Sequence, residues 1–133
     1  MTYFLDTNIC IYALKGTFPQ VQQHMESHVP SEIFIPAIVL AELYYGAYKS
    51  TAREKAIEAL REFSAAIQIA EFDSRSAVSY GDIRSKLEST DRPMGPNDLI
   101  VAATTMSNGG TLVTHNTKEF SAVPGLLFED WTR

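Results

Sequence analysis

Residues 2–14 read TYFLDTNICIYAL, a segment in which a β-prone run passes directly into a helix. Thr2 to Leu5 is suited to a short strand. The cluster Asp6-Thr7-Asn8 that closes it can cap a helix, which we expect from about Ile9 to Leu14. In folds built from such units, ligands bind beyond the carboxyl ends of the strands, so Asp6 is a candidate site residue.

The rest of the chain repeats this alternation of strand and helix. Strands alternating with helices predict an α/β fold, with a mainly parallel central sheet covered on both faces. Further strands are expected at Ile33–Ile35, Ile67–Ile69, Thr111–Thr114 and Leu126–Phe128, and further helices at Pro19–His28, Pro36–Gly46, Arg53–Phe63, from Asp73 or Ser74 onward, and Asp98–Met106.

Three local details follow from the same patterns. Asn97 is a good N-cap for the helix that starts at Asp98. Val78 is expected on the apolar side of the helix after Asp73, together with Ile83 and Leu87. The segment from His115 to Phe120 is expected to form a polar loop or turn.

Length and composition favour one compact domain over residues 1–133, because 45% of the residues are hydrophobic. No run approaches the roughly 20 apolar residues of a membrane-spanning helix, and the N-terminus lacks the pattern of a signal peptide. The single cysteine, Cys10, has no partner for an internal disulfide and is expected to be a buried apolar side chain. We therefore expect a cytoplasmic protein.

The net charge of -5 argues against a broad basic face that grips nucleic acid. This objection weakens if part of the acidity lies in a metal site, because bound divalent cations invert the local charge and attract phosphate.

Acidic side chains are predicted to gather at the carboxyl edge of the sheet. Asp6 follows the first strand, and Asp98 begins a helix reached through a loop. Glu42 lies roughly 9 Å along its helix, but side chains lean towards the helix N-terminus and can reach the same edge. Oxygen ligands favour magnesium or manganese, and magnesium held by few carboxylates suits phosphoryl transfer. No cysteine and histidine cluster has zinc spacing, although His24 and His28 form an i, i+4 pair.

Each of these acids also has a purely structural explanation. Asp6 can cap the first helix, although Asn8 is an equally good cap. Asp98 lies where the helix dipole favours acids, and Glu42 can face solvent. Asn116 and Glu119 can shape a turn.

Four motifs, in order and at their observed separations, resemble the PIN domain of VapC-type toxins from type II toxin-antitoxin systems. The motifs are FLDTN at 4–8, AELYYG at 41–46, GPNDLIVAA at 95–103 and THNTKEF at 114–120, and the likeness continues through VPGL at 123–126 and EDW at 129–131. The resemblance spans essentially the whole chain.

The resemblance implies a three-layer α/β/α domain with magnesium-dependent endoribonuclease activity on structured RNA such as tRNA or rRNA, with manganese able to substitute. It also implies homodimerisation and neutralisation by a VapB-type antitoxin. Asp6 and Asp98 match the family's principal metal ligands, and Glu42 matches the third acid. Many relatives have a further aspartate where this chain has Asn116, so Asn116 or Glu119 is the candidate for that catalytic position. Thr7 and Thr114 match hydroxyl positions of the family.

The expected reaction is in-line attack of a metal-activated water on a phosphodiester, which leaves a 5′-phosphate. Two alternatives are a catalytically weak PIN-like binding module and a phosphatase of the haloacid dehalogenase type, which would need an aspartate where Asn8 stands. Candidate RNA contacts are Lys15, Lys49, Arg84, Lys86, Arg92 and Lys118. A partner helix has a candidate groove beside the helices after Pro36 and Arg53, with Tyr44, Tyr45 and Tyr48 as anchors or as core residues.

Overall fold

A computed structural model describes residues 1–133 and contains one five-stranded sheet in which every pair of neighbouring strands is parallel. The strand order is β3-β2-β1-β4-β5. The bounds are β1 Tyr3–Leu5, β2 Ile33–Pro36, β3 Gln68–Ala70, β4 Thr111–Val113 and β5 Leu127–Glu129. The predicted parallel sheet is confirmed, and the first strand of the chain lies at its centre.

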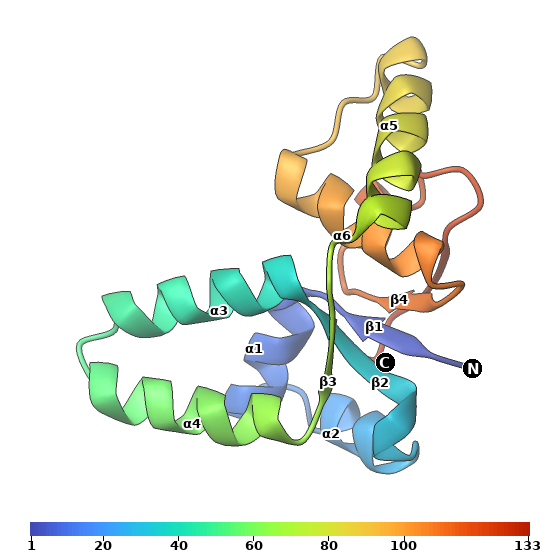
Figure 1. Cartoon of the computed structure of the whole chain (residues 1–133). Helices are drawn as coiled ribbons and strands as arrows, with labels where there is room; N and C mark the ends of the chain where they lie inside the picture. Colours follow the sequence, from blue (N-terminus) through green and yellow to red (C-terminus); the bar gives the residue numbers. More distant parts are fainter.

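Helices cover both faces of this sheet, so the predicted three-layer α/β/α architecture is also confirmed. In Figure 1, α5 and α6 rise on one side of the sheet, while α1, α2 and α4 lie on the other. The helical bounds are α1 Thr7–Lys15, α2 Pro19–Glu26, a 3-10 turn at Pro30–Glu32, α3 Ala37–Lys49, α4 Arg53–Ala65, α5 Ser74–Ser89, α6 Pro96–Ser107 and α7 Thr117–Phe120.

The core is densest around β1, because a central parallel strand is buried on both faces. Tyr3, Phe4 and Leu5 are all buried, and the ring of Phe4 stacks on that of Phe34 at 5.0 Å between centroids. The strand ends at Leu5, and the backbone N–H of the next residue, Asp6, continues the ladder by donating to Val113 O at 3.1 Å. The packing of β1 between β2 and β4 therefore fixes where Asp6 stands.

Helix α1 begins at Thr7 rather than near Ile9, because Asp6 is its cap. A carboxylate oxygen of Asp6 accepts the Ile9 N–H at 3.0 Å. Between the two candidate caps, Asp6 and Asn8, the structure selects Asp6, as expected for a side chain at the last extended position before the helix.

Other local predictions were wrong. Asn97 is not a cap, because α6 begins at Pro96, two residues before the predicted start at Asp98. The fixed φ of Pro96 suits a first helical position. The segment predicted as a polar loop contains the short helix α7. Val78 does not face the core, since it is 75% exposed, whereas Ile83 and Leu87 are buried as expected.

The C-terminal segment is held by a cluster of stacked rings around Trp131. Trp131 is 0% exposed and stacks with the rings of His24 and His28, at centroid distances of 5.2 and 5.4 Å. His24 lies in α2 and His28 just after it, and this i, i+4 pair packs against an indole ring. None of the helices has both the length and the apolar character needed to cross a membrane.

A pair of glycine substitutions tests the close packing around β1. Gly110 precedes β4, and an added Cβ there would collide with the buried ring of Phe4. We expect Gly110→Ala to lower the free energy of unfolding by about 1–3 kcal/mol. Gly81, within α5, has open space around it, so Gly81→Ala is expected to raise that free energy by about 0.5–1 kcal/mol. Urea denaturation of both variants measures the difference, and equal effects would contradict the packing described here.

Candidate active site

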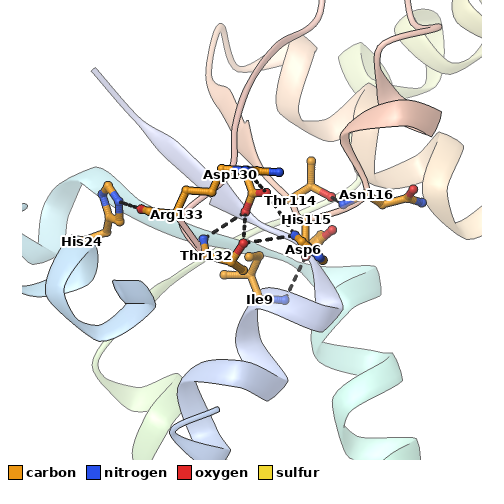
Figure 2. A network of polar contacts seen from close by, with 9 residues as sticks. All are labelled: Asp6, Ile9, His24, Thr114, His115, Asn116, Asp130, Thr132 and Arg133. Carbon is orange, nitrogen blue, oxygen red and sulfur yellow. Dashed lines mark hydrogen bonds and ion pairs between the residues drawn. The ribbon is translucent and has the colours of Figure 1, made fainter. Parts of the chain in front are cut away.

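Asp6 stands at the carboxyl end of the central strand with a nearly buried side chain, 8% exposed. Burial raises the pKa of Asp6, hydrogen bonds from the Thr114 hydroxyl and the Ile9 N–H oppose this, and the charges of Glu42 and Asp130 raise it further. The Thr114 hydroxyl also accepts the backbone N–H of Asn116 at 2.9 Å (Figure 2). Thr114 therefore links Asp6 to the segment that follows β4.

Glu42 reaches the same edge from α3, as the lean of helical side chains predicted. The Thr7 hydroxyl donates to its Oε1 at 2.6 Å, and the Asn97 amide donates to its Oε2 at 3.3 Å. These two bonds join α1, α3 and α6, whose residues lie far apart in the sequence. Glu42 is thus not a solvent-facing glutamate that interrupts an apolar helix by chance.

Asp98, in the first turn of α6, carries the largest carboxylate pKa shift in the site. Burial, the charge of Glu119, a hydrogen bond with Glu119 and the charges of Glu42 and Asp6 together raise the pKa of Asp98 to about 6. Glu119 in turn accepts a hydrogen bond of 2.6 Å from the Asn116 amide. Apart from burial, every cause of this shift is another acidic side chain, and these acids come from different parts of the chain. The carboxylates are therefore close enough to repel one another.

A cavity of about 180 Å³ lies where these elements meet. Its polar lining consists of Asp6, Thr7, Asn8, Glu42, Asp98 and Asn116. The structure therefore brings together Asp6, Glu42, Asp98 and Asn116 in one hollow, and it places Glu119 behind them, bonded to Asn116 and acting on Asp98.

Two residues near the site were missed by the sequence reasoning. Asn97 was interpreted as a local helix cap, but its amide holds Glu42, and no local pattern reports a contact across 55 positions. The other is Asp130, whose charge contributes to the raised pKa of Asp6. The rule that singled out Asp6, an acid directly after a strand, would have found Asp130, which follows the last residue of β5.

The donor set fits a hard divalent cation, because every charged donor in the cavity is a carboxylate and their mutual repulsion is relieved by a positive ion. No group of three His, Cys, Asp or Glu side chains is placed so that it could hold one ion together. Magnesium, however, keeps several waters and binds through one or two carboxylates, so it does not need three protein ligands in place.

Sequence comparison relates the whole chain to ribonucleases. A sequence model of the PIN domain matches residues 3–126. The chain is 37% identical to "Ribonuclease VapC2" of Rickettsia felis, over 100% of both proteins. It is 34% identical to the "tRNA(fMet)-specific endonuclease VapC" of Salmonella typhimurium, over 98% of both.

Structural comparison agrees. The crystal structure of DNA-bound VapBC from Salmonella typhimurium matches with a TM-score of 0.93 and 34% identity, over 98% of each chain. That of VapBC2 from Rickettsia felis, bound to a DNA fragment from its promoter, matches with a TM-score of 0.92 and 37% identity, over 98% of this chain and 99% of the other.

The raised pKa of Asp98 predicts how stability depends on pH in the metal-free protein. A carboxyl group whose folded pKa lies above its unfolded value stabilises the fold at low pH, and this contribution is lost as the pH rises through the folded value. For Asp98 the loss falls between about pH 4 and the folded pKa of about 6. Asp98→Asn removes the repelling charge and keeps the size of the side chain.

In EDTA at pH 7.5 we therefore expect the melting temperature of Asp98→Asn to be higher than that of wild type by roughly 2–5 °C. At pH 4 this difference should disappear. Thermal unfolding across this pH range measures it. Glu58→Gln, an exposed change on α4, is the control and should show no such dependence. An Asp98→Asn protein that melts lower than wild type at pH 7.5 would contradict the repulsion among these acids.

Proposed function

The chain belongs to the PIN-domain family and, within it, to the VapC ribonucleases, and from this premise we propose that it is a magnesium-dependent endoribonuclease and the toxin of a toxin-antitoxin pair. The observation that carries the proposal is the convergence of Asp6, Glu42 and Asp98 on one cavity at the carboxyl edge of the sheet. Such clustered acids weaken the fold unless a cation joins them, so a binding role explains their arrangement better than a structural one.

We assign separate roles to the site residues. Asp6 and Asp98 hold the metal, and Glu42 completes the charge around it. Thr7 and Asn97 fix Glu42 through its two oxygens, and Thr114 fixes Asp6. Asn116 and Glu119 form one hydrogen-bonded unit, in which Asn116 lines the cavity and Glu119 adds charge behind Asp98.

A bound magnesium or manganese ion supplies Lewis-acid stabilisation of the phosphate and lowers the pKa of water. The residues of this chain orient the substrate against that ion. Hydrolysis by water leaves a 5′-phosphate and a 3′-hydroxyl and does not use the RNA 2′-hydroxyl as nucleophile. As substrate we propose a structured RNA, with tRNA before rRNA, because relatives with this length and architecture are named tRNA(fMet)-specific endonucleases.

We propose further that residues 1–133 work as one PIN domain, as a homodimer and in the cytoplasm, where tRNA is found. Exposed apolar side chains on α3 and α5 offer surface for a second copy, since Tyr45 is 65% and Val78 75% exposed. The sequence offered Tyr45 and Tyr48 as anchors for a partner helix, but neither side chain lines the groove between α1, α3 and α4.

A groove that suits the antitoxin lies between α1, α3 and α4 of this chain. This cavity of about 320 Å³ is lined largely by small and aliphatic side chains, among them Leu14, Leu43, Ala47, Ala59 and Leu60. Glu42 forms part of its wall as well as part of the acidic cavity. An amphipathic antitoxin segment in the groove can therefore place a basic side chain against the site carboxylates and replace the metal.

The first experiment measures cleavage of bulk tRNA with magnesium, with manganese and with EDTA, followed by mapping of the new 5′ ends. We expect a few defined cuts that need either metal. Asp98→Asn is expected to lose at least about a hundredfold in kcat/KM while remaining folded, because it loses the charge that holds the cation. Asp82→Asn, an exposed change on α5, serves as the matched control. Cleavage by Asp98→Asn at the wild-type rate would remove Asp98 from the active site.

The second experiment tests the groove with Ala59→Glu, which puts a carboxylate on an apolar wall that the antitoxin must cover. We expect the affinity for the cognate antitoxin to fall by at least about tenfold, because a buried charge without a partner is unfavourable. Cleavage of tRNA should stay near the wild-type level. Val29→Glu, an exposed apolar position outside the groove, is the control. Unchanged antitoxin affinity of Ala59→Glu, measured by calorimetry, would place the antitoxin elsewhere.

A further inference from the structure

His115 lies in the short segment between β4 and α7 and forms a pair with Asp130 that the proposed reaction does not use. Its Nδ1 lies 3.0 Å from Asp130 Oδ2 and 3.1 Å from the Thr132 hydroxyl (Figure 2). Asp130 cannot donate as a carboxylate, and the Thr132 hydroxyl already donates to Asp130 Oδ1 at 2.7 Å. Nδ1 must therefore carry the proton and donate, which fixes the orientation of the ring.

The carboxylate that orients His115 is itself rigidly held. The side chain of Asp130 is only 9% exposed. Although burial opposes it, hydrogen bonds from the hydroxyl and backbone of Thr132 and from His115 lower the pKa of Asp130 and keep it ionised. The next residue, Trp131, is fully buried and stacks with the rings of His24 and His28. The rings of Tyr12 and Phe18 lie 6.3 and 6.0 Å from the His115 ring between centroids.

This rigid pair stands beside the acidic cavity. His115 directly follows Thr114, whose hydroxyl binds Asp6, and directly precedes Asn116, which lines the cavity. The charge of Asp130 is close enough to Asp6 to contribute to the raised pKa of that carboxyl group. The backbone of His115 therefore lies at the rim of the acidic cavity, although its ring is not part of the cavity lining.

The other ring nitrogen of His115, Nε2, has no hydrogen-bond partner within the chain, and the side chain is 47% exposed. If His115 served only as a structural link, a staple between β4 and the C-terminal segment, it would need only Nδ1. Nε2 donates to a phosphate oxygen when the ring is protonated and accepts from a ribose 2′-hydroxyl when it is neutral. Both groups belong to the RNA backbone.

Two of the six candidate RNA contacts already have partners within the chain. Of the candidate RNA contacts, Arg84 is paired with Glu88 and Lys86 with Asp82. A fixed imidazole next to the acidic cavity is a better placed donor than these residues of α5, which already have partners.

We propose that His115 is a substrate-contacting residue whose Nε2 hydrogen-bonds the RNA backbone beside the cleaved phosphodiester, oriented by Asp130 and Thr132. This inference rests on the proposed nuclease function and names a contact of the same site.

Two substitutions separate a contact from a staple. Asn places an amide N–H near the position of Nδ1, so His115→Asn keeps the bond to Asp130 and loses Nε2. Gln places its amide near Nε2, so His115→Gln keeps a group for RNA and loses the bond to Asp130. The proposal expects His115→Asn to melt with wild type and to bind RNA about tenfold more weakly. It expects His115→Gln to melt lower and to keep most of its affinity.

The readout is fluorescence anisotropy with a short labelled single-stranded RNA, in calcium so that binding is measured without cleavage. A DNA of the same sequence identifies the contacted group. If His115→Asn loses affinity for RNA only, Nε2 contacts the 2′-hydroxyl, and if it loses affinity for both, Nε2 contacts phosphate.

Wild-type affinity of His115→Asn overturns the proposal, and so does a wild-type protein that binds no RNA. A wild-type protein that binds RNA through His115 but does not cleave tRNA with magnesium overturns the proposed function and leaves this contact standing. In cleavage assays of an active enzyme, we expect His115→Asn to raise KM with kcat nearly unchanged, whereas loss of kcat alone would also count against it.

Discussion

Repulsion among acids is the constraint around which this molecule is arranged. Asp6, Glu42, Asp98 and Glu119 come from four different elements, and the pKa of Asp98 rises to about 6 partly because the other three are close. A fold tolerates such a group only if its scaffold is stable enough to hold the charges against their own field. The buried strand β1 and the small buried residues of α6, Val101, Ala102 and Ala103, provide that scaffold.

Each of three of these acids, Asp6, Glu42 and Glu119, is held in place by hydrogen bonds from neutral side chains. Thr114 fixes Asp6, Thr7 and Asn97 fix Glu42, and Asn116 fixes Glu119. None of these donors adds a positive charge, so each carboxylate keeps its full attraction for a cation. A lysine or arginine in any of these places would pair with the acid permanently and compete with the metal. By the same reasoning, the proposed antitoxin would inhibit the site by delivering a basic side chain to these acids.

The sequence predicted the parts of this arrangement that obey local rules. The position of Asp6 follows from the passage of a strand into a helix, and that of Glu42 from the lean of helical side chains. Asn97 was misinterpreted because its local setting is that of a cap, while its partner lies 55 residues away. The union of Asp98 with Glu119, and of His115 with Asp130, depends on β4 lying between β1 and β5, and strand order is not written in any local pattern.

The central place of β1 also has a consequence for protein synthesis. β1 leaves the ribosome first, but one of its two neighbours, β4, begins only at Thr111. The acidic cavity needs Asn116, so it cannot form until α6 and β4 have emerged as well. The residues of the apolar groove all lie between Ile11 and Leu60. A growing chain thus completes the elements of the apolar groove, the proposed antitoxin surface, well before it can assemble the acidic cavity, so a nascent chain would meet its proposed partner before it could cut RNA.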